Sequence, residues 1–246
     1  MNVKEFVSFI EKGELDAVLT ELYGKENLTY QRARYISAVR GFEKEYGDAD
    51  ELRLFSVPGR SEVSGNHTDH NHGKVLAASI DLDIIAVATR TDDGVIAVKS
   101  EGFPEDVVKI SEIAVDESKF ATSFAVIEGM CDGFVKHGYT VGGFRAYTTS
   151  NVFKGSGLSS SAAFEVMIGN ILRSLYNNEI DNVEIAKISQ YSENVFFGKP
   201  CGLMDQMACA VGGFISIDFK DPSEPVITSP EFDLSAIGYS LCIVDT

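Results

Sequence analysis

The sequence predicts an α+β fold, because segments with helical periodicity and segments typical of strands occur in separate runs rather than in strict alternation. Two predicted helices, residues 3–23 and 30–46, come first. Three segments rich in β-branched and apolar side chains follow at residues 52–57, 75–89 and 95–98. No internal repeat, low-complexity linker or shift in composition divides the 246 residues, so a single domain is expected.

Turn-forming residues set the boundaries of the first elements. Residues 24–27, Gly-Lys-Glu-Asn, separate the two N-terminal helices. Pro58-Gly59 is expected to end the first strand, because proline and glycine favour a turn at that point. Asp92-Asp93-Gly94 then predicts a hairpin turn that joins the second strand to the third.

The remaining elements are placed by the same patterns. Helices are predicted at residues 121–137, 159–176 and 183–196, and strands at residues 141–149 and 213–219. The final apolar run, residues 239–244, is typical of a strand but stops at Asp245-Thr246 with no polar residues to finish it. We therefore expect the chain to be part of a longer protein.

Composition excludes several classes of partner. The formal net charge is −16, with 21 Lys and Arg against 37 Asp and Glu, so binding of the chain to a nucleic-acid backbone is not expected. The sequence has no apolar run long enough for a membrane helix, and residues 1–10 lack the features of a signal peptide. These features predict a cytoplasmic protein without a membrane partner. The four cysteines form no Cys-x-x-Cys pair and are expected to be reduced.

The most informative motif is a glycine- and serine-rich turn at residues 155–163, Gly-Ser-Gly-Leu-Ser-Ser-Ser-Ala-Ala, which runs directly into a predicted amphipathic helix. Unpaired backbone N–H groups and the positive end of the helix dipole favour an anion there, and glycines let the backbone approach it. A nucleoside triphosphate is the natural ligand. The alternative is a serine-capped helix after a flexible turn. The turn follows neither the P-loop nor the dinucleotide pattern, since Ser160 stands where the latter has its third glycine.

A second polar constellation begins at Pro58-Gly59-Arg60 and continues at residues 67–73, His-Thr-Asp-His-Asn-His-Gly. The turn at Pro58-Gly59 is expected to project Arg60 away from the sheet, and the polar side chains that follow can hydrogen-bond a polyhydroxylated ligand. A solvated loop is an equally good interpretation of this segment alone. A zinc site is less favoured, because the remaining histidine, His137, lies on a separate predicted helix.

The third constellation is residues 200–206, Pro-Cys-Gly-Leu-Met-Asp-Gln. Its aspartate, Asp205, stands among apolar neighbours, so it either caps a helix or is a partly buried functional acid. Glu193, on the preceding predicted helix, is a candidate magnesium ligand if it lies beside a phosphate-binding serine, because Mg²⁺ prefers oxygen donors.

In this order and at these separations, the three constellations resemble the galactokinase branch of the galactokinase, homoserine kinase, mevalonate kinase and phosphomevalonate kinase superfamily. The resemblance covers most of the chain from about Leu52 onward. It implies a mixed sheet with helices packed on one side, and it implies that residues 1–246 are an amino-terminal domain that binds sugar and ATP. The family also has a carboxy-terminal domain that closes over the site, and the resemblance implies that this domain lies outside residues 1–246.

The resemblance also implies roles for individual residues. Asp205 would lie next to the sugar C1 hydroxyl as a base or an orienting group, and Arg60 would stabilise both the phosphoryl group and Asp205. Ser161 and Glu193 would hold Mg²⁺. The residues expected to surround the ATP phosphates are Gly155, Gly157, Leu158, Ser159, Ser160, Ser161 and Ala162. The residues expected to hold sugar hydroxyls are Asn66, His67, Asp69 and Gly202.

Departures from the family pattern lie in the sugar site. Galactokinases carry Gly-Glu-His-Thr-Asp-Tyr-Asn, where this chain has Asn66 in place of the glutamate and His70 in place of the tyrosine. A neutral amide thus replaces a carboxylate, which predicts weaker affinity or a preference for another sugar. The usual Pro-x-Gly-Gly-Gly is replaced by residues 153–157, Phe-Lys-Gly-Ser-Gly, so Lys154 adds a cation near the phosphates.

The resulting hypothesis is an ATP-dependent sugar 1-kinase that acts on galactose. A related sugar kinase with a different preference, and a kinase-derived sensor that binds sugar and ATP without turnover, are the alternatives. A metal-dependent hydrolase built on His67, Asp69, His70 and His72 is the least favoured.

Overall fold

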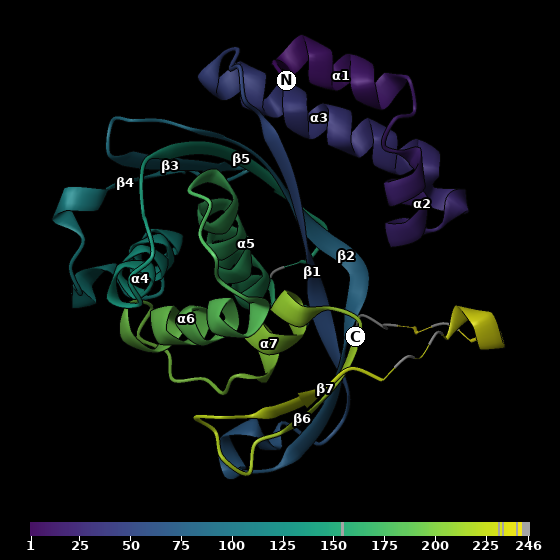
Figure 1. The fold of residues 1–246 in the computed structure, drawn as a ribbon, viewed down its shortest axis with the longest axis vertical. Helices are drawn as coiled ribbons and strands as arrows, with labels where there is room; N and C mark the ends of the chain where they lie inside the picture. Colours follow the sequence, from purple (N-terminus) through teal and green to yellow (C-terminus); the bar gives the residue numbers. More distant parts are fainter. Residues whose placement is uncertain (154, 231, 233, 240, 243–246) are drawn as a thin grey trace.

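A seven-stranded mixed sheet forms the centre of the structure (Figure 1). The computed structural model describes residues 1–153, 155–230, 232, 234–239 and 241–242. The strand order is β4-β3-β5-β2-β6-β7, with β1 paired to the other edge of β2. Only β3 and β5 run parallel, which confirms the α+β class with a mixed sheet. The strands are β1 (Arg53–Ser64), β2 (Lys74–Arg90), β3 (Val95–Ser100), β4 (Glu105–Lys109), β5 (Phe144–Ser150), β6 (Phe214–Asp218) and β7 (Val226–Thr228).

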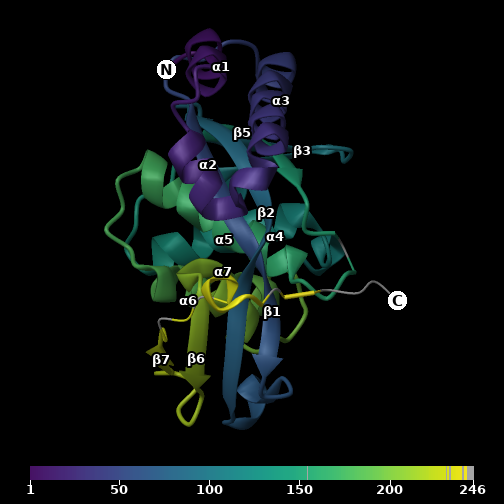
Figure 2. The same ribbon diagram turned by 90° about the vertical axis from the view of Figure 1, so that its right-hand side faces the viewer.

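The long strand β2 organises the sheet. Its first residues, 74–78, pair with β6, and residues 84–90 pair with β5, while β1 pairs with it along most of its length. Figure 2 shows β1 and β2 extending together from the helical end of the molecule to the β6–β7 end. One continuous element therefore connects the two ends of the structure.

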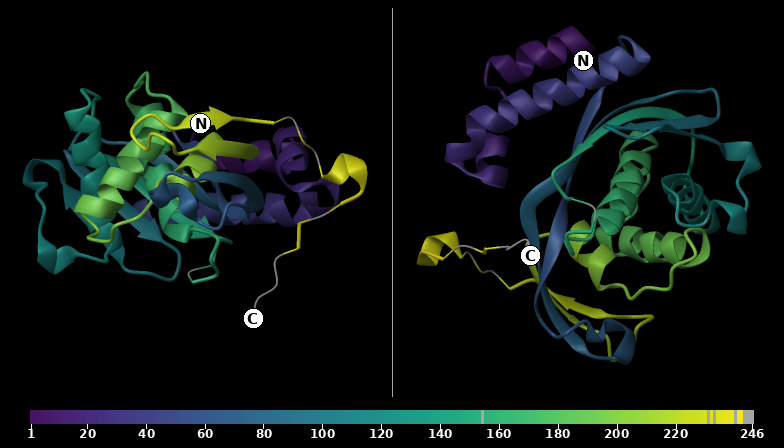
Figure 3. Two further views of the ribbon diagram at one scale, coloured as in Figure 1. Left: turned by 90° about the horizontal axis from the view of Figure 1, so that it is seen from below. Right: turned by 180° about the vertical axis from the view of Figure 1, so that it is seen from behind.

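Helices cover both faces of the sheet. As expected, the predicted helices α4 (Ser123–Lys136), α5 (Ser160–Leu175) and α6 (Asn182–Val195) cover one face, where α7 (Met204–Val211) joins them. A second layer, α1 (Val3–Glu11), α2 (Asp16–Tyr23) and α3 (Leu28–Tyr46), lies on the other face, where the sequence analysis expected none (Figure 3). The reason is that residues 84–88 of β2 are apolar on both faces, so each face needs a cover.

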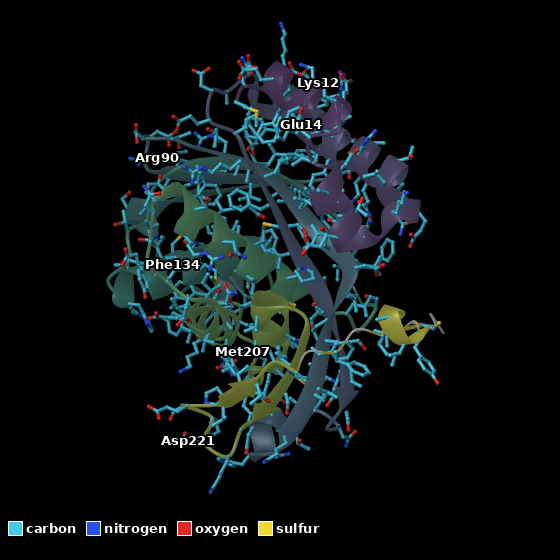
Figure 4. The ribbon with its side chains drawn as sticks, turned by 45° about the vertical axis from the view of Figure 1, so that its right-hand side comes forward. Lys12, Glu14, Arg90, Phe134, Met207 and Asp221 are labelled. Carbon is cyan, nitrogen blue, oxygen red and sulfur yellow. The ribbon has the colours of Figure 1, made fainter. Side chains whose placement is uncertain are left out.

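The core divides according to the alternation of β2. Ala86 and Ala88 face α4 and α5, whereas Ile85 and Val87 face α3. In Figure 4, Phe134 of α4 and Met207 of α7 lie inside the first helical layer, while Lys12 and Asp221 lie at the periphery. The side chains of Phe134 and Met207 are fully buried.

A buried polar cluster joins the second helical layer to the sheet. Asp83 of β2 accepts hydrogen bonds from Arg34 Nη1 at 2.5 Å and from Tyr23 Oη at 2.5 Å. The Ser56 hydroxyl of β1 donates to the same carboxylate at 2.5 Å. The side chains of Arg34 and Asp83 are only 6% and 3% exposed, so this is an ion pair removed from solvent.

Two features of the N-terminal half differ from the predicted ones. The helix expected over residues 3–23 is divided into α1 and α2, because Gly13 adopts a left-handed φ of +81° between them. The strand expected to stop at Pro58-Gly59 continues to Ser64, with a register shift between Pro58 and Arg60. Proline is tolerated there because β1 is an edge strand whose outer N–H groups need no partner strand.

The predicted hairpin between the second and third strands does not form. The turn at residues 92–94 is present, but β5 lies between β2 and β3 and pairs with both. Gly143, just before β5, accepts a hydrogen bond from the Thr91 backbone N–H at 2.8 Å, which brings β5 against the end of β2. The sequence analysis also missed β4, α7 and β7.

The other predicted elements are confirmed within a few residues. These are α3 to α6, β2, β3, β5 and β6. The strand expected at residues 239–244 falls largely outside the described residues, and Tyr239, Leu241 and Cys242 are not in a strand. Among the helices that the structure describes, none is both long and apolar enough to cross a bilayer.

Candidate active site

The centre of the candidate site is an ion pair between strand β1 and helix α7. Arg60 Nε donates to Asp205 Oδ1 at 2.8 Å, and Arg60 Nη2 donates to Asp205 Oδ2 at 2.7 Å. The third branch, Nη1, donates to the backbone oxygen of Gly157 at 2.7 Å. The Arg60 guanidinium thus connects strand β1, helix α7 and the glycine-rich turn, three segments that are far apart in the sequence.

The position of Arg60 differs from the expected one. It lies within β1 rather than after a turn, and it is almost fully buried. Its backbone N–H donates to the oxygen of Leu158 at 3.1 Å, and a Cβ added at Gly59 would lie 2.8 Å from that same oxygen. The glycine is therefore required because the glycine-rich turn passes directly against β1.

Ser159 connects helix α5 to the acid. It is the N-cap residue, but it adopts a left-handed φ of +59° and its side chain does not cap the helix. The hydroxyl instead donates to Asp205 Oδ2. The simple serine-capped helix considered from the sequence is therefore wrong, and the first backbone N–H groups of α5 receive no bond from the N-cap side chain.

The pKa of Asp205 results from opposing effects. Burial raises it, but the hydrogen bonds and positive charge of Arg60, with the Ser159 hydroxyl, outweigh burial and lower the pKa below its ordinary value. Asp205 is consequently a stable carboxylate at neutral pH, suited to accepting a hydrogen bond and poorly suited to taking a proton early in a reaction.

The glycine-rich turn is open where a ligand would approach. Gly155 and Gly157 have φ values of +84° and +75°, and among the described residues no atom lies within 4 Å of a Cβ added at either one. Leu158 is buried in the core and fixes the end of the turn. Ser160, Ser161 and Ala162 form the first turn of α5, with both serines partly exposed and the alanine buried. Lys154 lies outside the described residues.

Asp69 and Gly202 are brought together beside α7. The Asp69 carboxylate is nearly buried, and its Oδ2 accepts the backbone N–H of Met204 at 3.2 Å. A Cβ on Gly202 would lie 1.8 Å from this oxygen, so only glycine fits. Because Met204 immediately precedes Asp205, this contact places Asp69 at the same helix start. His70 Nδ1 lies 3.4 Å from Asp69 Oδ1 and its ring is largely exposed.

Asn66 and His67 occupy a strained turn. Gly65, Asn66 and His67 all have positive φ, at 129°, 56° and 50°. Both Asn66 and His67 are exposed. Glu62 of β1, which the sequence analysis did not name, accepts the His67 backbone N–H through Oε1 at 2.9 Å, and its Oε2 lies 3.3 Å from His67 Nε2.

Glu193 belongs to a second cluster behind this site. It is nearly buried in α6, and its Oε2 accepts a hydrogen bond from Gln206 Nε2 at 2.7 Å, while Lys199 Nζ lies 3.4 Å from Oε1. The same Gln206 nitrogen donates to Oε2 of the fully buried Glu165 at 3.1 Å. Burial and the neighbouring Glu193 charge raise the pKa of Glu165 well above its ordinary value. The sequence analysis missed both Glu165 and Gln206.

The predicted residues thus separate into two groups. Arg60, Asp205, Ser159 and Gly157 meet directly, and Asp69 and Gly202 join them through the start of α7. Ser161 and Glu193 share no hydrogen bond in the described part of the chain. Within those residues, no three His, Cys, Asp or Glu side chains are grouped as metal ligands.

Two family patterns match the chain, and each contains part of this site. Residues 124–213 match the N-terminal domain of the GHMP kinases, and residues 40–90 match the galactose-binding signature of the galactokinases. The first range contains the glycine-rich turn and Asp205, and the second contains Arg60 and Asp69.

Curated proteins named galactokinase also match the chain. The galactokinase of Bacillus subtilis is 33% identical over 175 residues, which are 70% of this chain and 44% of that protein. The galactokinase of Streptomyces coelicolor is 33% identical over 210 residues, 83% of this chain and 53% of that protein. The chain therefore spans about half the length of the curated relatives it matches.

Solved structures share the fold. Lactococcus lactis galactokinase complexed with galactose has a TM-score of 0.73 at 28% identity, over 81% of this chain and 53% of that one. Methanococcus jannaschii mevalonate kinase has a TM-score of 0.62 at 17% identity, over 76% of this chain and 58% of that one. At this lower identity the second likeness concerns the fold alone.

Proposed function

We infer that this chain, which carries the N-terminal domain of the GHMP kinases and the galactose-binding signature of the galactokinases, is the sugar- and phosphate-binding part of a galactose kinase. The proposed reaction transfers the terminal phosphoryl group of ATP to the C1 hydroxyl of galactose. The observation that carries the proposal is the convergence of Arg60, Asp205 and the turn before α5, because phosphoryl transfer depends mainly on positioning and charge stabilisation.

The glycine-rich turn fits the phosphates of ATP. Its two left-handed glycines leave open space above the backbone, and α5 presents N–H groups that its N-cap side chain leaves unbonded. Gly155, Gly157 and Leu158 would line the backbone of this cradle, together with Ser159, Ser160, Ser161 and Ala162. Arg60 adds a nearly buried positive charge at its edge.

The donor set is also suited to Mg²⁺. The Ser161 hydroxyl and the Glu193 carboxylate are hard oxygen ligands, and Mg²⁺ typically takes one or two carboxylates together with phosphate oxygens. Two buried acids, Glu193 and Glu165, are bridged by a single amide, so a cation would relieve the repulsion between them. When bound, Mg²⁺ neutralises charge on the transferred phosphoryl group.

Asp205 would act on the sugar as an acceptor. Because Arg60 and Ser159 stabilise its ionised form, we propose that it orients the C1 hydroxyl and receives the proton late, which suffices for a loose transition state. Asp69, His67, Asn66 and the Gly202 backbone would hold the remaining hydroxyls.

Turnover assays on the complete protein test this proposal. The protein is incubated with Mg-ATP and each of a panel of free hexoses, and ADP is expected to form when the hexose is galactose. The variant Asp205→Asn is expected to reduce kcat by orders of magnitude. Asp92→Asn is the matched control and should leave kcat unchanged, because Asp92 is exposed and its side chain accepts hydrogen bonds from Arg90 on another part of the sheet. Turnover with a different hexose in place of galactose would change the proposed substrate. Binding of galactose and ATP without any turnover would instead support the sensor alternative.

A further inference from the structure

Strand β1 carries an acidic side chain, Glu62, two residues after Arg60. Residues 60 and 62 alternate with Ser61, and they pair in order with Ser79 and Ala77 of β2. Side chains two residues apart on a strand leave the same face. Glu62 therefore projects to the face on which Arg60 meets Asp205, and this follows only because β1 continues through Pro58-Gly59.

Both carboxylate oxygens of Glu62 contact His67. One carboxylate oxygen accepts the backbone N–H of His67, and the other lies 3.3 Å from its Nε2. The Glu62 side chain is 12% exposed, whereas the His67 side chain is 58% exposed. The acid is thus held beneath the turn, and the imidazole extends from it into solvent, where a ligand can reach it.

The contact bears on which ring nitrogen carries a hydrogen. An ionised carboxylate only accepts hydrogen bonds and repels a lone pair, so the 3.3 Å approach favours a hydrogen on the Nε2 that faces Glu62. In the neutral ring, Nδ1 is then left as an acceptor. The second contact involves the imidazole alone and not the backbone of the turn.

No other acid of this turn is available for the task. Position 66 is a neutral asparagine, and the buried Asp69 carboxylate is engaged by the Met204 backbone N–H. Glu62 is therefore the acid that accompanies His67 on the sugar side of the site.

We propose that Glu62 is a positioning residue of the sugar site, which fixes the orientation and protonated nitrogen of His67 so that Nδ1 accepts a hydrogen bond from a sugar hydroxyl. This inference rests on the proposed function, since it assigns the residue to the binding of sugar rather than of nucleotide.

Glu62→Gln separates the two contacts. A glutamine oxygen can still accept the His67 backbone N–H, but its NH₂ group would face Nε2 as a donor and favour the opposite tautomer. In the complete protein, the KM for galactose is expected to rise about 3- to 10-fold, the effect of losing one hydrogen bond between a sugar hydroxyl and a neutral ring nitrogen. The KM for ATP and the melting temperature are expected to stay within about twofold and about 2 °C of the unmodified protein, because the variant keeps the backbone bond.

A double-mutant cycle tests whether Glu62 acts through His67. The variant Glu62→Gln/His67→Ala should have the same KM for galactose as His67→Ala alone, because the imidazole is then absent. Glu105→Gln is the matched control: this strand glutamate accepts one side-chain hydrogen bond, from Tyr46, on another part of the sheet. It should leave the KM for galactose unchanged.

Three results would overturn the inference. One is an unchanged KM for galactose in Glu62→Gln, including the case in which only the melting temperature falls, because Glu62 would then be structural. Another is an additive effect in the double mutant. The third is absence of turnover by the unmodified protein with every sugar, which removes the proposed function itself and is seen before any variant is made.

Discussion

Replacement of Arg60 by lysine gives a direct measure of the forked contact at the centre of the site. Arg60 makes two side-chain hydrogen bonds to Asp205 and one to Gly157, and an ammonium group cannot keep the planar fork. If one of the three bonds survives, two are lost, at about 1.5–3 kcal/mol each. The sum is about 3–6 kcal/mol, or about 10²–10⁴-fold in kcat/KM.

Solvent reduces this figure. The Arg60 side chain is 8% exposed but that of Asp205 is 33% exposed, so part of the pair is screened and the lower end, about 10²–10³-fold, is expected. The assay is kcat/KM for galactose from ADP release by the complete protein, with thermal unfolding as a check on folding. Arg53→Lys is the matched control, because Arg53 lies on the same strand and bonds Ser174, away from the site. A folded Arg60→Lys enzyme within about threefold of the unmodified kcat/KM would refute the reasoning.

Three further predictions concern the surroundings of this pair. Gly202→Ala should raise the KM for galactose with little change in the KM for ATP, because the added Cβ would lie only 1.8 Å from Asp69 Oδ2 and would push that carboxylate aside. Equal increases in the two KM values would contradict this prediction. Asp83→Asn should lower the free energy of unfolding by about 3–5 kcal/mol in denaturant titrations, because the buried Arg34 guanidinium loses its counter-charge. The lowered pKa of Asp205 means that its ionised form adds stability above the ordinary aspartate range and that this contribution is lost as the pH falls through the folded-state pKa. The difference in melting temperature between the unmodified protein and Asp205→Asn should therefore shrink between about pH 5 and pH 3, and a constant difference would exclude this origin.

Local patterns were sufficient for much of the fold. Long amphipathic helices such as α3 and α5 were placed within a few residues, because a 3.6-residue period persists over several turns. The turn at residues 155–159 was placed correctly before α5, because glycines and serines before an apolar helix are a local signal. The pairing of β2 with β5 instead of β3 was not predictable, since nothing in residues 92–94 shows that a later strand will lie between their neighbours.

The site shows the same division. The contact of Arg60 with Asp205 was expected from the resemblance to the galactokinase branch, but the predicted position of Arg60 after a turn was wrong, because Pro58 looks like a strand terminator unless β1 is known to be an edge. Glu62 and Gln206 were missed for a related reason. Each is an ordinary polar residue in the sequence, and only the assembled fold shows that their partners, His67 and Glu193, lie within reach.

The closeness of Gly59 to the carbonyl of Leu158 has a wider consequence. Strand and loop are held in register by main-chain atoms, at a separation with no room even for a methyl group. Apart from the buried Leu158, the side chains of the described loop residues are therefore not needed to fix its position. Substitutions at Phe153 and Ser156 can accumulate without moving the glycine-rich turn relative to β1, whereas a single carbon added at residue 59 would separate the two.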